Sequence, residues 1–205
     1  MLRVGRGTLP RMSGYDAAAA LLVVDVQNDF ADPEGSLSVV GGEEIVPRAN
    51  EEIRAAIASG ATIVYTQDWH PPSTPHFKKD GGIWPVHCVR DTWGAELHPQ
   101  LDVRGPVVRK GTGGEDGYSG FSVRDPLSGE RSSTTLEEEL RSRGVQRVAI
   151  AGLATDYCVV ETAIDATHLG FRTAVIRDAI RAVNLEPSDG ERAIERMREA
   201  GATIL

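Results

Sequence analysis

The sequence contains only two cysteines, Cys88 and Cys158, among its 205 residues. Two cysteines are too few for the disulfide framework of a small secreted protein, so we expect a reducing, cytoplasmic environment. Long apolar runs are also missing, because the longest one, residues 17–26, is interrupted by Asp25 and is too short to span a membrane. We therefore expect neither a secreted disulfide scaffold nor an integral membrane protein.

Basic residues are fewer than acidic residues. The chain has 22 Lys and Arg against 30 Asp and Glu, which gives a formal net charge of −8. Such a balance disfavours the phosphates of nucleic acids and of anionic lipids, so we expect no nucleic-acid partner and no membrane partner. Apolar content of 40% and charged content of 25% are ordinary for a globular protein. We expect a small-molecule partner, and the composition leaves a homo-oligomer open.

The N-terminal residues differ from the rest of the chain. The first 15 carry Arg3, Arg6 and Arg11 without an acidic residue, and they lack the apolar core of a signal peptide. We predict that residues 1–15 form a disordered tail, with Met12 as an alternative start. Residues 16–205 are predicted to form a single domain, which is long enough for one buried core.

Apolar segments alternate along the chain with segments of helical spacing. Strands are predicted by the apolar or β-branched runs at residues 17–26, 61–68, 105–111, 145–152, 171–178 and 202–205. Helices are predicted at residues 41–60, 134–144, 155–169 and 188–200, and a glycine-rich loop at 113–129. This alternation predicts an α/β fold: a doubly wound, mostly parallel sheet of about six strands with helices on both faces, in a Rossmann-like three-layer arrangement.

Reactive side chains lie where three of the predicted strands end. Asp25 ends the first strand, Lys110 ends the third, and Cys158 follows the fourth. Ligands bind at the carboxyl ends of the strands in sheets of this kind, so we expect these three side chains to share one rim. An acid, an ammonium and a thiol are together the parts of a covalent catalyst.

The roles of these groups follow from their chemistry. The thiolate is the nucleophile, and Lys110 and the first turn of a helix are expected to lower the pKa of Cys158. Asp25 would accept the thiol proton and pass it to a leaving amine. The backbone N–H groups of Ala154 and Cys158 would form an oxyanion hole. These residues predict acyl transfer: attack on a carbonyl, loss of an amine and hydrolysis of a thioester.

A loop rich in proline and glycine follows the second predicted strand. It contains a D-x-H pair, Asp68 and His70, followed by His76 and His87. One carboxylate and three imidazoles suit a single divalent transition metal, Zn²⁺, Fe²⁺ or Mn²⁺, and the ligand set does not choose among them. Other candidate ligands are assigned no role in the site: His98, His168 and Cys88.

The motifs at these strand ends are similar to those of a known family. They are DVQNDF (25–30), DWH (68–70), WPVHC (84–88), RKG (109–111), YSGF (118–121) and GLATDYCVVETA (152–163). In this order they resemble the nicotinamidases of the isochorismatase-like hydrolase superfamily, over residues 17–205. The resemblance implies an isochorismatase-like fold, with residues 16–205 as one hydrolase domain.

The resemblance also implies roles for individual residues. Cys158 is implied to be the nucleophile, Asp25 the general base, and Lys110 the partner that helps to activate the thiol. The implied metal ligands are Asp68, His70 and His87, with His76 as the extra histidine that some members use. A cis peptide is implied between Leu153 and Ala154, where it would present the Ala154 N–H as part of the oxyanion hole. The implied aromatic walls around a pyridine ring are Phe30, Trp84, Tyr118 and Tyr157.

The implied activity is deamidation of nicotinamide to nicotinate and ammonia in pyridine nucleotide salvage, with pyrazinamide as a surrogate substrate. The metal would bind the pyridine nitrogen and so position the carboxamide over Cys158. One segment departs from the family pattern. The loop KGTGGEDGY, residues 110–118, is rich in glycine and acidic.

Three other interpretations remain open at this point. The first is another isochorismatase-like hydrolase, acting on isochorismate, N-carbamoylsarcosine or a ureido acid, which would not need the histidine site. The second is a nitrilase-type enzyme, which would need a glutamate where this chain has Asp25. The third is a non-catalytic metal- or thiol-binding protein. A redox version of the third is disfavoured, because Cys158 has no partner at C-x-x-C spacing.

Overall fold

The computed structural model describes residues 14–205. Most of the tail predicted at residues 1–15, and the alternative start at Met12, lie outside the described residues. Tyr15, the last residue of that predicted tail, donates a hydrogen bond from its hydroxyl to Glu52 at 2.6 Å. Among residues 14–205, no helix combines the length and apolar character needed to cross a membrane.

The central sheet of the described region has six strands, and every neighbouring pair in it is parallel. The strands are β1 (Ala19–Val24), β2 (Thr62–Asp68), β3 (Val107–Lys110), β6 (Arg147–Leu153), β7 (Arg172–Arg181) and β8 (Thr203–Ile204). Their order across the sheet is β3-β2-β1-β6-β7-β8. The predicted doubly wound α/β fold is confirmed.

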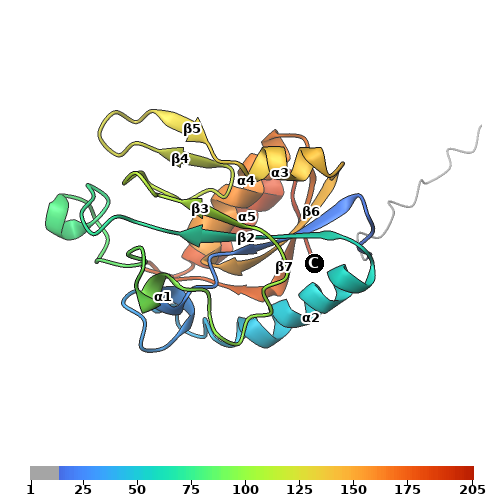
Figure 1. Cartoon of the computed structure of the whole chain (residues 1–205), viewed down its shortest axis with the longest axis horizontal. Coiled ribbons are helices and arrows are strands. Elements are labelled where there is room, and N and C mark those ends of the chain that lie inside the picture. Colours follow the sequence, from blue (N-terminus) through green and yellow to red (C-terminus); the bar gives the residue numbers. More distant parts are fainter. Residues whose placement is uncertain (1–13) are drawn as a thin grey trace, which may run out of the picture.

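Helices cover both faces of the sheet (Figure 1). The short α1 (Asn28–Ala31) and the longer α2 (Ile45–Ala58) lie on one side, and α3 (Leu136–Ser142), α4 (Val160–His168) and α5 (Asp189–Glu199) lie on the other. The two faces follow from the alternation of side chains along a strand. Leu21 and Val23 of β1 pack in the core beneath α2, whereas Leu22 and Val24 pack in the core beneath α3, α4 and α5. The apolar run of β1 is therefore buried on both sides.

A small antiparallel hairpin projects from this framework. It consists of β4 (Ser122–Arg124) and β5 (Arg131–Ser133), and it overlaps the segment predicted as a loop at residues 113–129. The prediction of a loop throughout that segment was wrong. Both strands are three residues long and none of their residues is fully buried, so they show no apolar alternation that could have signalled them.

The order of the strands brings the carboxyl ends of β3, β2, β1 and β6 side by side. The chain runs outward from β1 to β2 and β3, and it then resumes on the opposite side of β1 with β6. This reversal makes a topological switch point beside β1, where sheets of this kind bind ligands. Gly152 allows β6 to lie against β1 there, because a Cβ on it would fall 2.0 Å from the Val24 carbonyl oxygen.

Candidate active site and metal centre

Adjacent strand ends bring the predicted charged residues together. Asp25 directly follows β1, Asp68 is the last residue of β2, and Lys110 is the last residue of β3. The register of the parallel strands places Asp68 directly opposite Lys110. The side chains of all three are buried, so their charges face one another in a region from which water is largely excluded.

Lys110 is the hub of this charge cluster. Its Nζ lies 2.7 Å from Asp25 Oδ2 and 2.5 Å from Asp68 Oδ1, and it also donates to the Gly117 carbonyl. Burial by itself would lower the pKa of Lys110, but the Asp25 and Asp68 carboxylates outweigh it and hold the pKa well above its ordinary value. Lys110 is therefore a fixed cation, and its Nζ lies 3.8 Å from Cys158 Sγ.

Asp25 is positioned to exchange a proton. Its Oδ1 accepts a hydrogen bond from the Thr66 hydroxyl at 2.6 Å, and its Oδ2 faces Lys110. Burial raises the pKa of Asp25, and the Lys110 ammonium offsets only part of that rise. A carboxylate with a raised pKa is a better proton acceptor, which is what a general base requires.

Cys158 lies in a π-helical turn, Thr155–Val159, that joins β6 to α4. One carboxylate oxygen each of Asp25 and Asp68 and the Cys158 Sγ all lie within 4.8 Å of one another. Burial raises the pKa of the thiol well above its ordinary value, and Lys110 lowers it only in part. Lys110 lowers this pKa as expected, but the expectation of a lowered pKa overall was wrong, because the loss of water on burial outweighs the effect of Lys110. A thiol whose pKa is raised in this way would need a base to become a nucleophile, and the Asp25 carboxylate lies within 4.8 Å of it.

The two residues predicted to form an oxyanion hole border the same space. Ala154 and Cys158 both line the pocket described below, and the peptide bond between Leu153 and Ala154 is cis. The turn that carries Cys158 is anchored by the Asp156 carboxylate. That carboxylate accepts hydrogen bonds from the backbone N–H groups of Val183 at 2.9 Å and of Asn184 at 2.8 Å.

A pocket opens above Cys158, with a volume of about 450 Å³ that includes the open solvent at its mouth. All four predicted aromatic residues line it: Phe30, Trp84, Tyr118 and Tyr157. Trp84 Nε1 donates to the Tyr118 hydroxyl at 2.8 Å, and the Tyr157 ring meets the Trp84 ring edge-on at a centroid distance of 4.8 Å. The resulting walls are apolar and flat, which suits an aromatic ring.

Four lining residues were missed by the sequence analysis: Leu37, Val39, Gly117 and Val183. Leu37 and Val39 belong to the segment that follows α1, and Val183 lies just beyond the end of β7. The position of Val183 after a strand was the one usable signal, because ligands bind at such ends. Nothing in the local pattern marked the other three.

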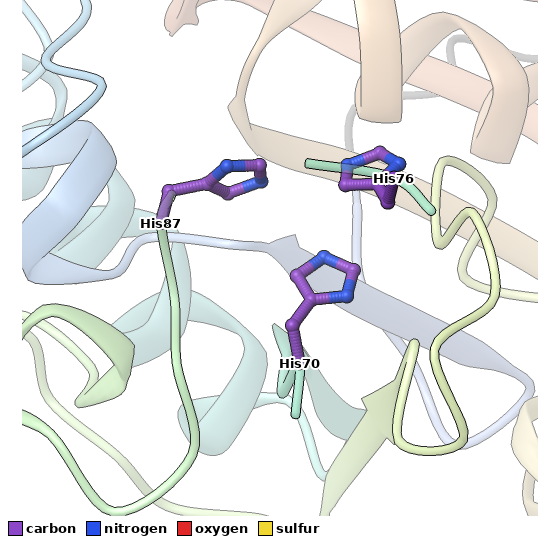
Figure 2. A group of neighbouring side chains, drawn as sticks. All are labelled: His70, His76 and His87. Atoms are coloured by element: carbon purple, nitrogen blue, oxygen red, sulfur yellow. The ribbon is translucent and has the colours of Figure 1, made fainter. Parts of the chain in front are cut away.

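Three of the predicted metal ligands form a cluster in which the imidazoles of His70, His76 and His87 surround a common space (Figure 2). One ring nitrogen from each lies within 4.8 Å of the others. His76 Nδ1 lies 2.7 Å from Asp116 Oδ1, and His87 Nδ1 lies 2.8 Å from the Pro85 carbonyl oxygen. When each Nδ1 donates a hydrogen bond to its acceptor, the Nε2 atom of the same ring carries a free lone pair.

Asp68 lies between the histidines and the charge cluster. Its Oδ1 contacts Lys110, and its Oδ2 lies 3.8 Å from His70 Nε2. Burial acts to raise the pKa of Asp68, but Lys110 and His70 outweigh it and hold the pKa below its usual range. The carboxylate is therefore ionised and can serve as a metal ligand.

The donor set fits a divalent metal ion. Within residues 14–205, both ring nitrogens of the buried His70 lack a hydrogen-bond partner. A buried imidazole without a partner is costly, and coordination of a metal by one of its nitrogens would remove part of that cost. The side chains that could hold the ion are His70, His76 and His87, with Asp68 beside them.

The residues that were assigned no role lie outside the pocket lining. His98 is buried in a turn, where its Nδ1 accepts from the Gln100 N–H at 3.3 Å. His168 is an exposed residue at the end of α4. Cys88 is buried, with its Sγ 3.9 Å from the Gly94 carbonyl oxygen.

Proteins with similar sequences and solved structures with a similar architecture are known. The chain is 37% identical over 203 residues to the nicotinamidase of Escherichia coli (strain K12), with 90% of this chain and 93% of that protein covered. It is 42% identical to the pyrazinamidase of Pyrococcus horikoshii, solved in complex with zinc, at a TM-score of 0.82, with 92% of this chain and 98% of that one covered. It is 35% identical to PnC1 from L. infantum, solved in complex with nicotinate, at a TM-score of 0.84, with 94% of each chain covered.

The family assignment rests on nearly the whole described chain. The isochorismatase domain model matches residues 19–205, from the first residue of β1 to the last residue of the chain. The match therefore includes every strand end that carries a candidate catalytic or metal-binding residue. With the sheet order, the buried cysteine turn and these relatives in agreement, the chain belongs to the isochorismatase family.

Proposed function

We propose that this protein is a metal-dependent cysteine amidohydrolase that deamidates nicotinamide to nicotinate and ammonia, through a thioester on Cys158. Pyrazinamide is the expected surrogate substrate. The observation that carries the proposal is the pocket itself. Cys158 lies within 4.8 Å of the Asp25 carboxylate, in a pocket whose walls also include four aromatic residues and two histidines of the metal cluster.

Features of the relatives support the choice of substrate. One relative is named a nicotinamidase, and another binds nicotinate, the product that the proposed reaction releases. The isochorismatase, N-carbamoylsarcosine and ureido alternatives have no need of the buried histidine cluster, so that cluster favours a pyridine carboxamide. Both cysteines are free thiols in the structure, which fits the reducing cytoplasm that we propose for its action.

Binding of the substrate would use the pocket walls. The pyridine ring would lie among Phe30, Trp84 and Tyr157, with its carboxamide directed at Cys158. The ion would be held by His70, His76 and His87 together with Asp68. When bound, a divalent metal supplies a coordination position for the pyridine nitrogen, which fixes the orientation of the ring.

Acylation would begin with proton transfer from Cys158 Sγ to the Asp25 carboxylate. The sulfur then attacks the carboxamide carbon, and a C–S bond forms as the carbonyl oxygen takes up negative charge. The N–H groups of Ala154 and Cys158 would stabilise that oxyanion. Asp25 returns its proton to the nitrogen, the C–N bond breaks, and ammonia leaves a thioester behind.

Deacylation would use the same groups in reverse order. Asp25 accepts a proton from a water molecule that attacks the thioester carbon. The C–S bond then breaks and the sulfur recovers its proton from Asp25. The nicotinic acid that forms gives up the second proton of the water to solvent and leaves as nicotinate. The fixed charge of Lys110 lies 2.7 Å from Asp25 Oδ2 and 3.8 Å from Cys158 Sγ. It would stabilise the negative charge whether that charge is on the carboxylate or on the sulfur.

Ammonia release from nicotinamide tests the proposed activity, and chelation tests its dependence on a metal. We expect steady ammonia release from the purified protein, a loss of it after dialysis against a chelator, and recovery on addition of Zn²⁺, Fe²⁺ or Mn²⁺. The loss is expected because the ring would no longer be oriented toward Cys158. Unchanged turnover in metal-depleted protein, checked by elemental analysis, would contradict the metal requirement. A folded, metal-loaded protein that releases no ammonia would contradict the substrate.

A further inference from the structure

The histidines of the cluster differ in what holds them in place. The ring of His87 is oriented by the carbonyl of Pro85, two residues away in the same loop. His70 has no hydrogen-bond partner on either ring nitrogen within residues 14–205. His76 instead contacts the side chain of Asp116, which is 40 residues away in the sequence, with Nδ1 and Oδ1 2.7 Å apart.

The Asp116 carboxylate is itself held from its other side. It is 6% exposed, and its Oδ2 accepts from Arg124 Nη2 at 2.8 Å and from Arg124 Nε at 3.3 Å. The backbones of these two residues are also paired, with N–O distances of 2.7 Å and 3.0 Å in the two directions. The carboxylate therefore has one oxygen committed to the guanidinium and presents the other to the imidazole.

This arrangement has a direct consequence for the imidazole. An acceptor at Nδ1 selects the form of the ring that carries its proton there, which leaves the Nε2 lone pair for a metal. It also fixes the rotation of the ring. Carboxylates that accept from the second nitrogen of a metal-binding histidine act in this way in metal sites generally.

We propose that Asp116, held by Arg124, is the positioning residue that orients His76 for metal binding. The proposal rests on the metal site proposed above. It gives a function to the acidic, glycine-rich loop at residues 110–118, and it links the hairpin of β4 and β5 to the metal centre. Neither Asp116 nor Arg124 lines the substrate pocket, so their effect on metal binding passes through the His76 imidazole.

The decisive measurement is the affinity of the metal-free protein for Zn²⁺ alone, by calorimetric titration without substrate. We expect Asp116→Asn to weaken binding by about 10- to 100-fold, the range seen when such a partner is removed. Arg124→Ala leaves the Asp116 carboxylate and the backbone pairing in place. Because the Arg124 side chain is 55% exposed, we expect its removal to lower the Zn²⁺ affinity by at most about fivefold.

Arg131→Gln is the matched control. Arg131 lies on β5 of the same hairpin, its side chain is 58% exposed, and it pairs with Asp165 at 3.2 Å rather than with Asp116. It should bind Zn²⁺ as the unaltered protein does. A loss in Arg131→Gln equal to that in Asp116→Asn would show that docking of the hairpin matters and the carboxylate does not, which overturns the proposal.

A double-mutant cycle separates action through His76 from a general structural effect. If Asp116 acts through the imidazole, Asp116→Asn adds no further loss of Zn²⁺ affinity in a His76→Ala background. Full additivity of the two losses would overturn the proposal, as would an Asp116→Asn protein with unaltered affinity. Failure of the unaltered protein to bind Zn²⁺ would instead refute the metal site itself, so the two failures are distinguishable.

Discussion

Replacing Cys158 by alanine is expected to lower the rate of ammonia release from nicotinamide by about 10⁶-fold, the scale on which enzymes of covalent mechanism lose activity with their nucleophile. No other sulfur lines the pocket, because Cys88 lies outside it and no methionine is among the lining residues of the described chain. Asp25 would remain beside the substrate but would have no thiol to deprotonate. The rate is measured by coupled detection of ammonia at saturating substrate.

The same substitution should leave the fold in place. Cys158 is small and buried, so loss of its sulfur is expected to cost about 1 kcal/mol of unfolding free energy, an ordinary value for a single replacement. Cys88→Ala is the matched control, because Cys88 is the other buried thiol and contacts neither Asp25 nor Lys110 in the hydrogen-bond network. We expect Cys88→Ala to retain turnover. Equal activity in the two variants would refute the covalent mechanism.

Replacing Lys110 by methionine is expected to cause the largest loss of stability of any single change in the site. Its side chain is fully buried and neutralises two carboxylates, Asp25 and Asp68. Methionine would leave these two acids close together without a cation. Removal of one partner from a buried ion pair costs about 3–5 kcal/mol, and we expect a loss of that size in the unfolding free energy of the metal-free protein. Urea denaturation with linear extrapolation measures it.

Lys79→Met supplies the control for Lys110→Met. Lys79 pairs with Asp80 at 2.7 Å, but its side chain is 46% exposed, so the pair contributes little. We expect Lys79→Met to change the unfolding free energy by less than about 1 kcal/mol. If the two variants lost the same amount, the buried cluster would not depend on the Lys110 charge, and the description of Lys110 as its hub would be wrong.

The sequence was most informative where a strand ends. The apolar runs stop at Asp25, Asp68 and Lys110, and parallel strands present their ends on one side, so a shared rim could be predicted. The order of the strands could not be predicted from those runs. The order depends on the side of β1 to which each crossover connection leads the chain. That order places β2 beside β3, and so Asp68 opposite Lys110.

The features that were missed depend on contacts between distant segments. Asp116 lies in a loop without periodicity, and only the folded chain brings its carboxylate to His76. The hairpin of β4 and β5 is too short and too exposed to show a pattern. The direction of the pKa shift of Cys158 was also missed, because the sequence reveals the nearby charge of Lys110 but not how completely the thiol is buried.

The proposed mechanism requires the Cys158 sulfur and the Asp25 carboxylate to act together on a bound pyridine carboxamide. Its most direct test is a rapid acid quench of the protein, in excess over nicotinamide, followed by digestion and mass spectrometry of the peptides. We expect a nicotinoyl group on the peptide that contains Cys158, at early times only, and none in an Asp25→Asn protein. Ammonia release without that group on Cys158 at any quench time would contradict it.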